Sequence, residues 1–353
     1  MDVQVLAAYG LEPQRFDVQP FGHGHINKTY LATDRAGDAH YILQRINTNV
    51  FKQPQIIARN HRLAGDYLAR TQPDYLLPHI IPTAAGDDLY CDGASYWRMT
   101  PYVPNTVALN EATSPQQAYE AARQFGRLAR LTADIDLSEF RPTIPNFHNL
   151  ALRFEAFEQA IASADDARRR KASDLIEAML AAASIVETYV ALVRDGGLPD
   201  RLMHHDTKIN NVLLHQDTFE GVCVIDLDTL MPGKILSDVG DMVRTYVCPV
   251  SEEVRDVSRV VVREAYFAAL MDGYLSEMRG ALTLLERELL FYAGEFMIYM
   301  QALRFLTDYL AGDVYYPITY DAHNLDRARN QWALLTCLRQ KERSLREIIR
   351  KCL

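Results

Sequence analysis

The sequence predicts an α+β protein in which a small, sheet-rich N-terminal lobe precedes a larger helical lobe with an embedded β-hairpin. The chain has 353 residues, which is long for a single hydrophobic core and suits two lobes. Strand-like segments are concentrated in the first hundred residues, whereas long segments with helical periodicity dominate the rest. We therefore expect lobes of residues 1–103 and 104–353.

The first lobe is predicted to hold two hairpins and a helix. The strand-like segments flank short turns and occupy residues 30–32, 40–46, 89–90 and 95–100. Apolar side chains recur near helical spacing over residues 55–70, which indicates a helix. The proline-punctuated residues 100–104 then end the strand region.

The second lobe is expected to be mostly helical. Helical patterns cover residues 115–134, 150–162, 168–194, 251–279 and 284–310. Among them lies one short β-rich insert, at about residues 202–230.

Composition limits the possible functions. Apolar residues make up 48% of the chain and charged residues 24%, as in ordinary globular proteins. The net charge of −9 argues against nonspecific nucleic-acid binding, which needs a basic face. No apolar run approaches the roughly 18 residues of a membrane span, and the N-terminus lacks a basic signal-peptide region, so we expect a cytoplasmic protein. Five scattered cysteines without a CxxC pair indicate neither a disulfide framework nor a zinc site.

The first motif lies at residues 204–214, HHDTKINNVLL. His204, Asp206 and Asn211 form the pattern H-x-D-x-x-x-x-N just before a short apolar strand. This is the spacing of the kinase catalytic loop, in which the aspartate accepts the proton of the acceptor hydroxyl and the asparagine binds magnesium.

The second motif is an apolar strand at residues 222–225 that ends in two acids, Asp226 and Asp228. On an extended chain, side chains two residues apart point to the same side. Carboxylates at such a strand end are suitable ligands for Mg²⁺. Because residues 215–221 supply a turn, the two motifs are expected to form one hairpin that presents Asp206, Asn211 and Asp226 at one edge.

Each motif also has an ordinary structural explanation. The H-x-D-x-x-x-x-N spacing occurs often by chance, and an aspartate at a strand end is commonly a turn or capping residue. The correct order and strand context of both motifs together favour the kinase interpretation. Farther along, one acid of the pair Asp238 and Asp241 is expected either to bond His204 or the loop backbone, or to cap a helix.

These motifs resemble the aminoglycoside phosphotransferase/choline kinase superfamily, which has the protein-kinase-like fold. The resemblance runs over nearly the whole chain and is closest to N-acetylhexosamine 1-kinases. It is carried by residues 24–27 (GHIN), 43–47 (LQRIN), 204–214 (HHDTKINNVLL), 224–233 (VIDLDTLMPG) and 304–313 (RFLTDYLAGD).

The resemblance implies an ATP- and Mg²⁺-dependent kinase with Asp206 as the base and with Asn211 and Asp226 holding the metal. It also implies four contacts to the sugar or phosphates, from Asp228, Arg304, His25 and Tyr315. As alternatives, Arg304 is a surface arginine and Tyr315 a packing residue. The turn at residues 21–25 contains Gly24, where a glycine permits close backbone approach to phosphate.

The sequence departs from the wider kinase pattern in the first lobe. Residues 41–46 lack the lysine that pairs with the nucleotide phosphates, and residues 55–63 lack its glutamate partner, with Arg59 or Asn60 in that region. Gln44 and Arg45 are the candidates to replace the lysine, and because adjacent strand residues face opposite sides, only one can serve. We favour Arg45 for its charge.

The adenine is expected under the segment that joins the lobes. The backbone groups of Thr100 and Tyr102 are the expected hydrogen-bond partners, and Met99 is expected to line the site. A plain interlobe linker is the alternative.

The expected reaction is phosphorylation of the anomeric hydroxyl of an N-acetylhexosamine. Another acceptor is the main alternative: an aminoglycoside, choline, ethanolamine, homoserine or a different sugar. The missing lysine and glutamate also raise the alternative of a nucleotide-binding pseudokinase. A protein kinase lacks support because no D-F-G or A-P-E string follows Asp226. The expected partners are ATP and a small molecule, with neither nucleic acid nor membrane.

Overall fold

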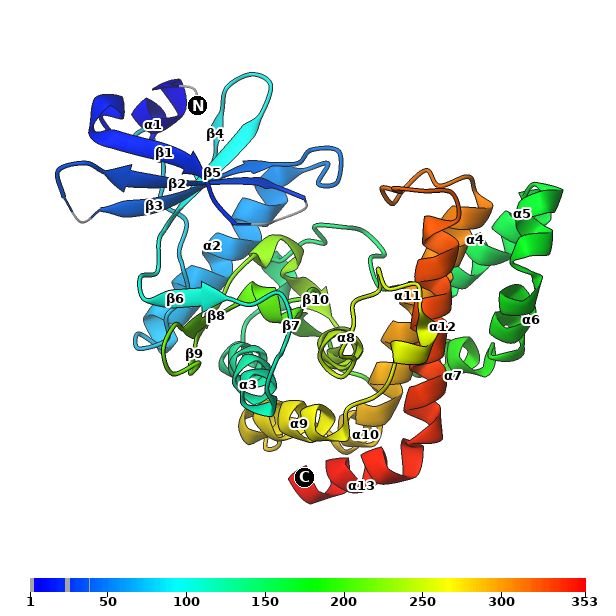
Figure 1. Cartoon of the computed structure of the whole chain (residues 1–353). Coiled ribbons are helices and arrows are strands. Elements are labelled where there is room, and N and C mark those ends of the chain that lie inside the picture. Colours follow the sequence, from blue (N-terminus) through cyan, green and yellow to red (C-terminus); the bar gives the residue numbers. More distant parts are fainter. Residues whose placement is uncertain (1–2, 23–25, 38) are drawn as a thin grey trace.

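The computed structural model describes residues 3–22, 26–37 and 39–353 (Figure 1). It confirms the predicted α+β class, because an N-terminal antiparallel sheet is followed by a larger helical part. The chain leaves the N-terminal sheet at Pro101 and enters a second sheet at Thr106, on either side of the expected lobe boundary.

The N-terminal sheet has five strands in the order β1-β2-β3-β5-β4. Its strands are β1 (Phe16–Pro20), β2 (Lys28–Asp34), β3 (His40–Ile46), β4 (Tyr90–Cys91) and β5 (Tyr96–Pro101). Gln44 on β3 lies opposite Thr29 on β2 and opposite Arg98 on β5. Helix α1 (Val3–Ala8) belongs to the same apolar cluster as Leu43 and Met99. Because side chains alternate along a strand, Gln44 and Arg98 project from the opposite face.

Helix α2 (Pro54–Thr71) follows β3 and connects the first lobe to the second. Its fully buried Asn60 donates to the backbone oxygens of Leu230, at 2.9 Å, and Arg141, at 2.7 Å. The Asn60 Oδ1 atom accepts from the backbone N–H of Arg141 at 3.2 Å. Neutral hydrogen bonds therefore fix α2 against the segment that follows Asp226.

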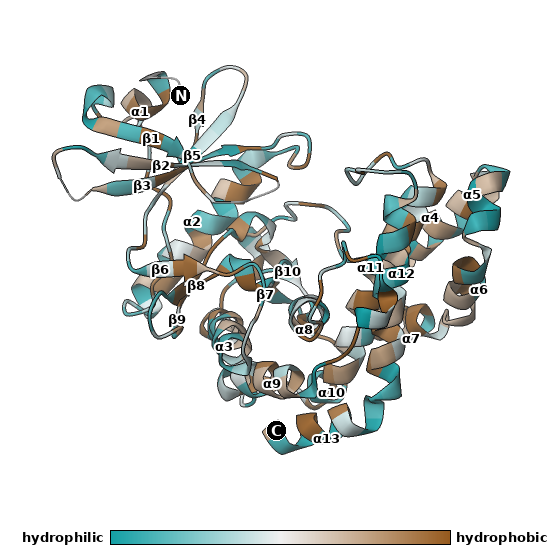
Figure 2. Cartoon of the chain, in the orientation of Figure 1, coloured by the Kyte–Doolittle hydropathy of each residue, from teal (hydrophilic) through white to brown (hydrophobic). Residues whose placement is uncertain are grey.

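The second lobe is built from eleven described helices around one large core. They are α3 (Pro115–Leu131), α4 (Leu150–Ser163), α5 (Asp166–Lys171), α6 (Ser173–Ala181), α7 (Ser184–Arg194), α8 (Ile235–Tyr246), α9 (Glu264–Met278), α10 (Leu284–Glu288), α11 (Leu290–Leu310), α12 (His323–Gln340) and α13 (Glu342–Cys352). Helices α3 and α9 approach closely at Gly273, where a Cβ atom would lie 2.2 Å from the Tyr119 carbonyl oxygen. Figure 2 shows hydrophilic and hydrophobic turns alternating along the outer helix α13.

Two small sheets position the segment that contains both motifs. Strand β6 (Thr106–Ala108) pairs with β8 (Val212–His215), which forms a hairpin with β9 (Gly221–Val224). Strand β7 (Arg201–Met203) pairs with β10 (Met231–Gly233). Helix α3 holds the hairpin turn, because Glu120 accepts from the Gly221 N–H at 2.9 Å and Gln124 donates to the Gly221 oxygen at 2.7 Å.

Three predicted helices are wrong in part. The predicted helix of residues 284–310 is interrupted at Leu289, which separates α10 from α11. Residues 168–194 form the last part of α5 and then α6 and α7, with breaks near Ala172 and Ala182. No glycine or proline in the sequence indicates these breaks. Residues 251–263 precede helix α9 as loop and one short turn. There, the Asp256 side chain accepts from the Ser258 N–H, and β-branched valines follow, so local bonding and extended backbone outcompete the helix. In addition, helices α1, α8, α12 and α13 and strands β1, β6 and β10 were not predicted.

Among the described residues, no single helix is long and apolar enough to cross a membrane. Only the neighbouring helices α6 and α7 taken together meet that criterion, and they are bent by 42° at their junction.

Candidate active site

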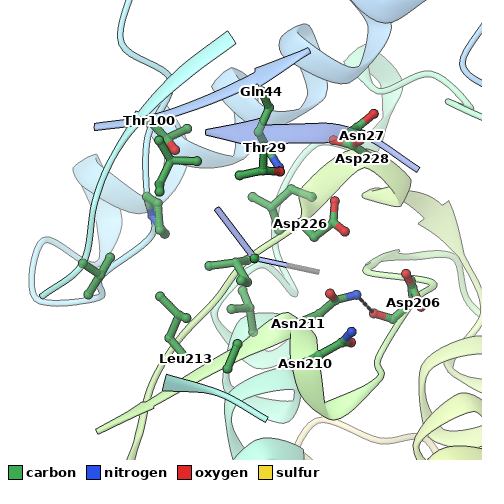
Figure 3. A pocket seen from close by; sticks show the side chains of 18 of the residues that line it. Asn27, Thr29, Gln44, Thr100, Asp206, Asn210, Asn211, Leu213, Asp226 and Asp228 are labelled. Carbon is green, nitrogen blue, oxygen red and sulfur yellow. Dashed lines mark hydrogen bonds between the residues drawn. The ribbon is translucent and has the colours of Figure 1, made fainter. Parts of the chain in front are cut away.

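A cavity of about 320 Å³ lies between the N-terminal sheet and the sheet that contains the β8–β9 hairpin. This volume is at the lower end of the range of about 300–1,000 Å³ typical of small-molecule sites. Figure 3 shows Thr29, Gln44 and Thr100 from the first lobe on one side and Asp206, Asn211 and Asp226 on the other. The structure therefore brings together the polar residues of both motifs.

Two buried acids of helix α8 hold the predicted catalytic loop, residues 204–211, by its backbone. The carboxylate of Asp238 accepts from the N–H groups of His204, at 3.0 Å, and His205, at 2.7 Å. Asp241 accepts from the Thr207 N–H at 2.8 Å. The expectation that one of these acids bonds the loop backbone is confirmed, and both acids do so. Neither caps the helix, because no side chain forms an N-cap bond at the start of α8.

His204 joins this loop to the strand that precedes Asp226. Its Nε2 atom lies 2.9 Å from the Ile225 carbonyl oxygen, and its Nδ1 atom accepts from the Asp206 N–H at 3.3 Å. A carbonyl can only accept and an N–H can only donate, so these partners assign the proton to Nε2. The ring is fully buried and packs edge-on against Phe125 of α3.

Asp206 and Asn211 project into the cavity from either end of the loop. The Asn211 Nδ2 atom donates to the Asp206 carbonyl oxygen at 2.8 Å, as drawn in Figure 3. The Asp206 side chain keeps 26% of its surface exposed, and its Oδ2 atom lies 3.3 Å from the Lys208 ammonium. The charge of Asp206 raises the pKa of Lys208, so the lysine stays charged beside the carboxylate.

Asp226 lies at the end of the second motif in a left-handed conformation, with φ of 60°. A short 3-10 turn at Leu227–Thr229 follows it, so the expectation that Asp226 and Asp228 share one side of an extended chain is wrong. Burial, together with the nearby charges of Asp228 and Asp206, raises the pKa of the Asp226 carboxyl to about 6. A cation at this position would relieve that destabilisation of the carboxylate.

Asp228 contacts the first lobe. One carboxylate oxygen accepts a short hydrogen bond from Asn27, and the other contacts the guanidinium of Arg98. The Asp228 side chain is 4% exposed and that of Arg98 is 3% exposed. These contacts occupy Asp228 with protein partners and bridge the two lobes beside the cavity.

The donor atoms of Asn211 and Asp226 suit magnesium. The amide of Asn211 is oriented by its Nδ2 bond to the loop, which leaves Oδ1 as a carbonyl ligand, and Asp226 adds a carboxylate. Within residues 3–22, 26–37 and 39–353, no three His, Cys, Asp or Glu side chains are grouped to hold a metal. Mg²⁺ is commonly held by only one or two carboxylates, with phosphate oxygens and waters completing its shell, so this sparse set fits.

On the first-lobe side of the cavity, the structure contradicts one predicted nucleotide-binding residue. Gln44 lines the cavity and donates to Thr29 Oγ1 at 3.1 Å, whereas Arg45 is exposed and does not line it. Strand alternation sends the two side chains to opposite faces, and the cavity face belongs to Gln44. The preference for Arg45 as the replacement for the missing lysine is therefore wrong.

The segment that joins the two lobes, residues 100–104, lines the cavity at the two positions that were expected. Thr100 and Tyr102 line it, but the backbone N–H of Tyr102 already donates to the His40 oxygen at 3.1 Å. Met99 is 1% exposed and packs in the α1 cluster on the other face of the sheet, so the expectation that it lines the site is wrong.

Arg304 and Tyr315 lie together outside the cavity, on the side of the catalytic loop. The Arg304 guanidinium carbon lies 5.6 Å from the Phe147 ring, 5.9 Å from Tyr315 and 5.5 Å from Tyr316. Tyr315 is 63% exposed. Such distances are typical of cation–π contacts.

A chain of rings connects this aromatic group to the catalytic loop. Phe147 stacks on His148 with centroids 4.2 Å apart, and His148 lies 5.4 Å from His205. Burial lowers the pKa of His205 to about 4, and burial beside His205 and Arg304 lowers the pKa of His148, so both rings are neutral near pH 7. Arg304 is thus placed near the loop residue that precedes Asp206.

Gly24 and His25 lie outside the described residues. The cavity residues that were not predicted include Lys208, Arg98 and Asn27. Lys208 is inside the first motif, and its position two residues after Asp206 was an available signal. Arg98 is a lone charge in an otherwise uncharged strand, whose meaning depends on a partner distant in sequence.

Replacing Asp238 with asparagine tests the anchoring of the loop. The amide would place an N–H₂ group against one of two buried backbone donors, so we expect a loss of about 1–3 kcal/mol in unfolding free energy, together with lower turnover. Urea unfolding measures the first. Asp174→Asn, at an acid whose side chain is 73% exposed, is the control. Wild-type stability in Asp238→Asn would contradict the anchoring role.

Comparisons with solved structures agree with the fold. A microcompartment-associated aminopropanol kinase is 16% identical, with 97% of each chain covered and a TM-score of 0.60. A spectinomycin phosphotransferase, solved with ADP and spectinomycin, is 14% identical, with 99% of this chain and 96% of that chain covered and a TM-score of 0.56. An ethanolamine kinase of Plasmodium vivax is 14% identical, with 92% and 84% covered and a TM-score of 0.56.

The family comparison is independent of these structures. The family model described as "Phosphotransferase enzyme family" matches residues 17–280, which is most of the chain and includes both motifs. Together with the cavity in which Asp206, Asn211 and Asp226 meet, this match shows that the chain belongs to the phosphotransferase enzyme family.

Proposed function

We propose that this protein is an ATP- and Mg²⁺-dependent kinase that phosphorylates a hydroxyl group of a small, oxygen-rich acceptor. The acceptor we favour is an N-acetylhexosamine, phosphorylated at its anomeric hydroxyl. The observation that carries the proposal is the meeting of Asp206, Asn211 and Asp226 in one cavity beneath the N-terminal sheet. A base, an amide oxygen and a carboxylate are the protein groups that phosphoryl transfer requires.

The nucleotide is assigned to the cavity, with its base near Thr100 and Tyr102. The Tyr102 N–H is engaged by His40, which leaves the carbonyl oxygens of this segment as the hydrogen-bonding groups for an adenine amino group. The ADP bound to the related spectinomycin phosphotransferase supports an adenine nucleotide as the donor.

Asn211 and Asp226 are the residues that would hold Mg²⁺. Bound there, the ion would neutralise phosphate charge during transfer. His204 keeps the two ligand segments together, because it contacts the Ile225 oxygen on one side and the Asp206 N–H on the other.

Asp206 is assigned as the base that accepts the proton of the acceptor hydroxyl. The N–H groups of its neighbours His205 and Thr207 are fixed by Asp238 and Asp241, whereas the Asp206 carboxylate stays partly open to the cavity. Lys208 beside it keeps a positive charge next to the position where phosphate is transferred. Orientation of the hydroxyl by a fixed carboxylate is the main contribution of the protein to such a reaction.

The acceptor is assigned to the side of Arg304 because two neighbouring arginines there make no ion pair with a described residue. Neither Arg304 nor Arg153 forms an ion pair with any described residue. Burial and the charge of Arg304 lower the pKa of Arg153, which donates to the Phe147 oxygen at 3.2 Å. Two neighbouring cations favour an acceptor that offers oxygen atoms, such as sugar hydroxyls and an acetamido carbonyl.

The same arginines favour a second candidate acceptor, a hydroxy amino acid such as homoserine, whose carboxylate would pair with them. They disfavour cationic acceptors of the kind named for the aminopropanol and ethanolamine kinases. The distinction rests on charge, so it is open to a direct comparison of acceptors.

The test is a panel assay with ATP and Mg²⁺, followed by ³¹P NMR. The acceptors are N-acetylglucosamine, N-acetylgalactosamine, glucose, galactose, homoserine, ethanolamine, choline and kanamycin. A sugar 1-phosphate formed from an N-acetylhexosamine supports the proposal. Product from homoserine alone would select the second candidate, and product from a cationic acceptor alone would contradict the assignment of Arg304. Nucleotide binding without product on any acceptor would favour a pseudokinase.

Replacing Asp206 with asparagine is expected to lower kcat by about 10²- to 10⁴-fold, since general base catalysis contributes that much. Unfolding free energy and ADP affinity are expected to stay near wild type, because the loop is held by its backbone. Asp217→Asn, in the exposed turn of the same hairpin, is the control. A coupled assay of ADP release measures turnover, and wild-type turnover in Asp206→Asn would remove Asp206 as the base.

Metal affinity is expected to fall as the pH is lowered through about 6. The pKa of Asp226 is raised to about 6, so protons compete with the cation below that pH. An ordinary aspartate would show almost no change between pH 8 and pH 5, whereas Asp226 should weaken binding about tenfold. Mn²⁺ titration of nucleotide-free protein, followed by the EPR signal of the free ion, measures this. Equal binding at both pH values, or a tenfold change that persists in Asp226→Asn, would contradict the assignment.

Replacing Arg304 with methionine is expected to raise the KM for the acceptor by about tenfold or more while leaving the KM for ATP unchanged. The reason is the loss of charge-assisted hydrogen bonds on the acceptor side only. Steady-state kinetics with each substrate varied in turn measures both constants. Arg170→Met, at an exposed position on α5, is the control. A change in the KM for ATP alone would contradict the assignment of Arg304 to the acceptor.

A further inference from the structure

The N-terminal sheet offers one fixed positive charge to the cavity. The residues of β2 and β3 that line it are Thr29, Ile42 and Gln44, all neutral. Among the described lining residues, the arginines and lysines are Arg98 on β5 and Lys208 on the catalytic loop. Arg98 is therefore the sheet residue that can meet an anion in this cavity.

Arg98 is held from two sides. Its Nε atom donates to Gln44 Oε1 at 2.8 Å, and Gln44 in turn donates to Thr29 Oγ1 at 3.1 Å. Its Nη1 atom contacts Asp228, which also accepts from Asn27. Because Gln44 and Arg98 are directly opposite in the β3–β5 register, the side chain of one strand positions that of the next.

The guanidinium keeps donors for a ligand. An arginine carries five N–H donors, and the Nε donor of Arg98 bonds to Gln44. Its Nη1 atom lies against Asp228 in the ion pair but makes no hydrogen bond there. No hydrogen bond joins Nη2 to any residue within 3–22, 26–37 or 39–353. A buried arginine is costly unless it is paired, and a fork with free donors at a cavity wall is suited to phosphate oxygens.

We propose that Arg98 binds the nucleotide phosphates from the N-terminal sheet, and that Gln44 and Asp228 position its guanidinium for this contact. The positive charge that the cavity face of β3 lacks is thus supplied by the neighbouring strand. This inference rests on the proposed use of a nucleotide, but not on the identity of the acceptor. It assigns to Asp228 a positioning role between the lobes.

Calorimetric titrations of ADP and of adenosine, both with Mg²⁺, test this contact. Arg98→Gln should weaken ADP binding by about 10- to 100-fold, as expected for a lost hydrogen bond to a charged group, and should leave adenosine binding unchanged. Adding Gln44→Lys to Arg98→Gln moves the charge to the opposite position on β3 and should restore most of the ADP affinity. Arg35→Gln, in the exposed turn after β2, is the control for a change in net charge.

Removing Arg98 alone leaves Asp228 buried without its cation, so unfolding is measured in parallel. If Arg98→Gln does not fold, Arg98→Gln/Asp228→Asn removes both charges and should show the same selective loss for ADP. Wild-type ADP affinity in either folded variant would overturn the inference, as would an equal loss for ADP and adenosine. Wild-type protein that binds neither ligand would instead contradict the proposed function, and the inference would fall with it.

Discussion

The bonds from Asp238 and Asp241 of α8 to the backbone of the catalytic loop are the constraint on which the candidate site depends. His205 takes a left-handed conformation with φ of 64°, which for a residue other than glycine costs on the order of 1–3 kcal/mol. Three backbone N–H groups of this loop donate to the two buried carboxylates, and these bonds offset that cost. The strained turn directs Asp206 toward the cavity and brings Asn211 back to bond its carbonyl oxygen.

On the side of the cavity that faces the first lobe, an ion pair between side chains, rather than hydrogen bonds to the backbone, holds the site together. Asp228 reaches from the second lobe to Asn27 and Arg98 of the first, so the lobes meet through a buried ion pair at the edge of the cavity. Asp226 lies between this pair and Asp206, and burial among these acids raises its pKa to about 6. Three carboxylates, a guanidinium and the Lys208 ammonium then surround one space, an arrangement suited to a metal–phosphate ligand that carries both signs of charge.

Sequence patterns predicted those site residues that lie close together along the chain. Asp206, Asn211 and Asp226 were found because the loop and the following hairpin bring them together within a short segment. Arg98 was missed, and Arg45 wrongly preferred, because strand alternation shows that two side chains diverge but not which face borders the cavity. The helix breaks near Ala172 and Ala182 were missed because no glycine or proline marks them in the sequence. The sugar contact expected from Asp228 stays a prediction, and its contacts with Asn27 and Arg98 were not foreseen because these partners are distant in sequence.

The central claim is that nucleotide phosphates and a divalent ion occupy the space between Asp226, Asn211 and Arg98. The most direct measurement is a crystal structure with Mn²⁺ and a non-hydrolysable ATP analogue, with the ion located by its anomalous scattering. The account predicts the manganese bound to oxygens of Asp226 and Asn211, the phosphates within hydrogen-bonding reach of Arg98, and the terminal phosphate facing Asp206. A nucleotide bound elsewhere, or a metal held without Asp226, would contradict it.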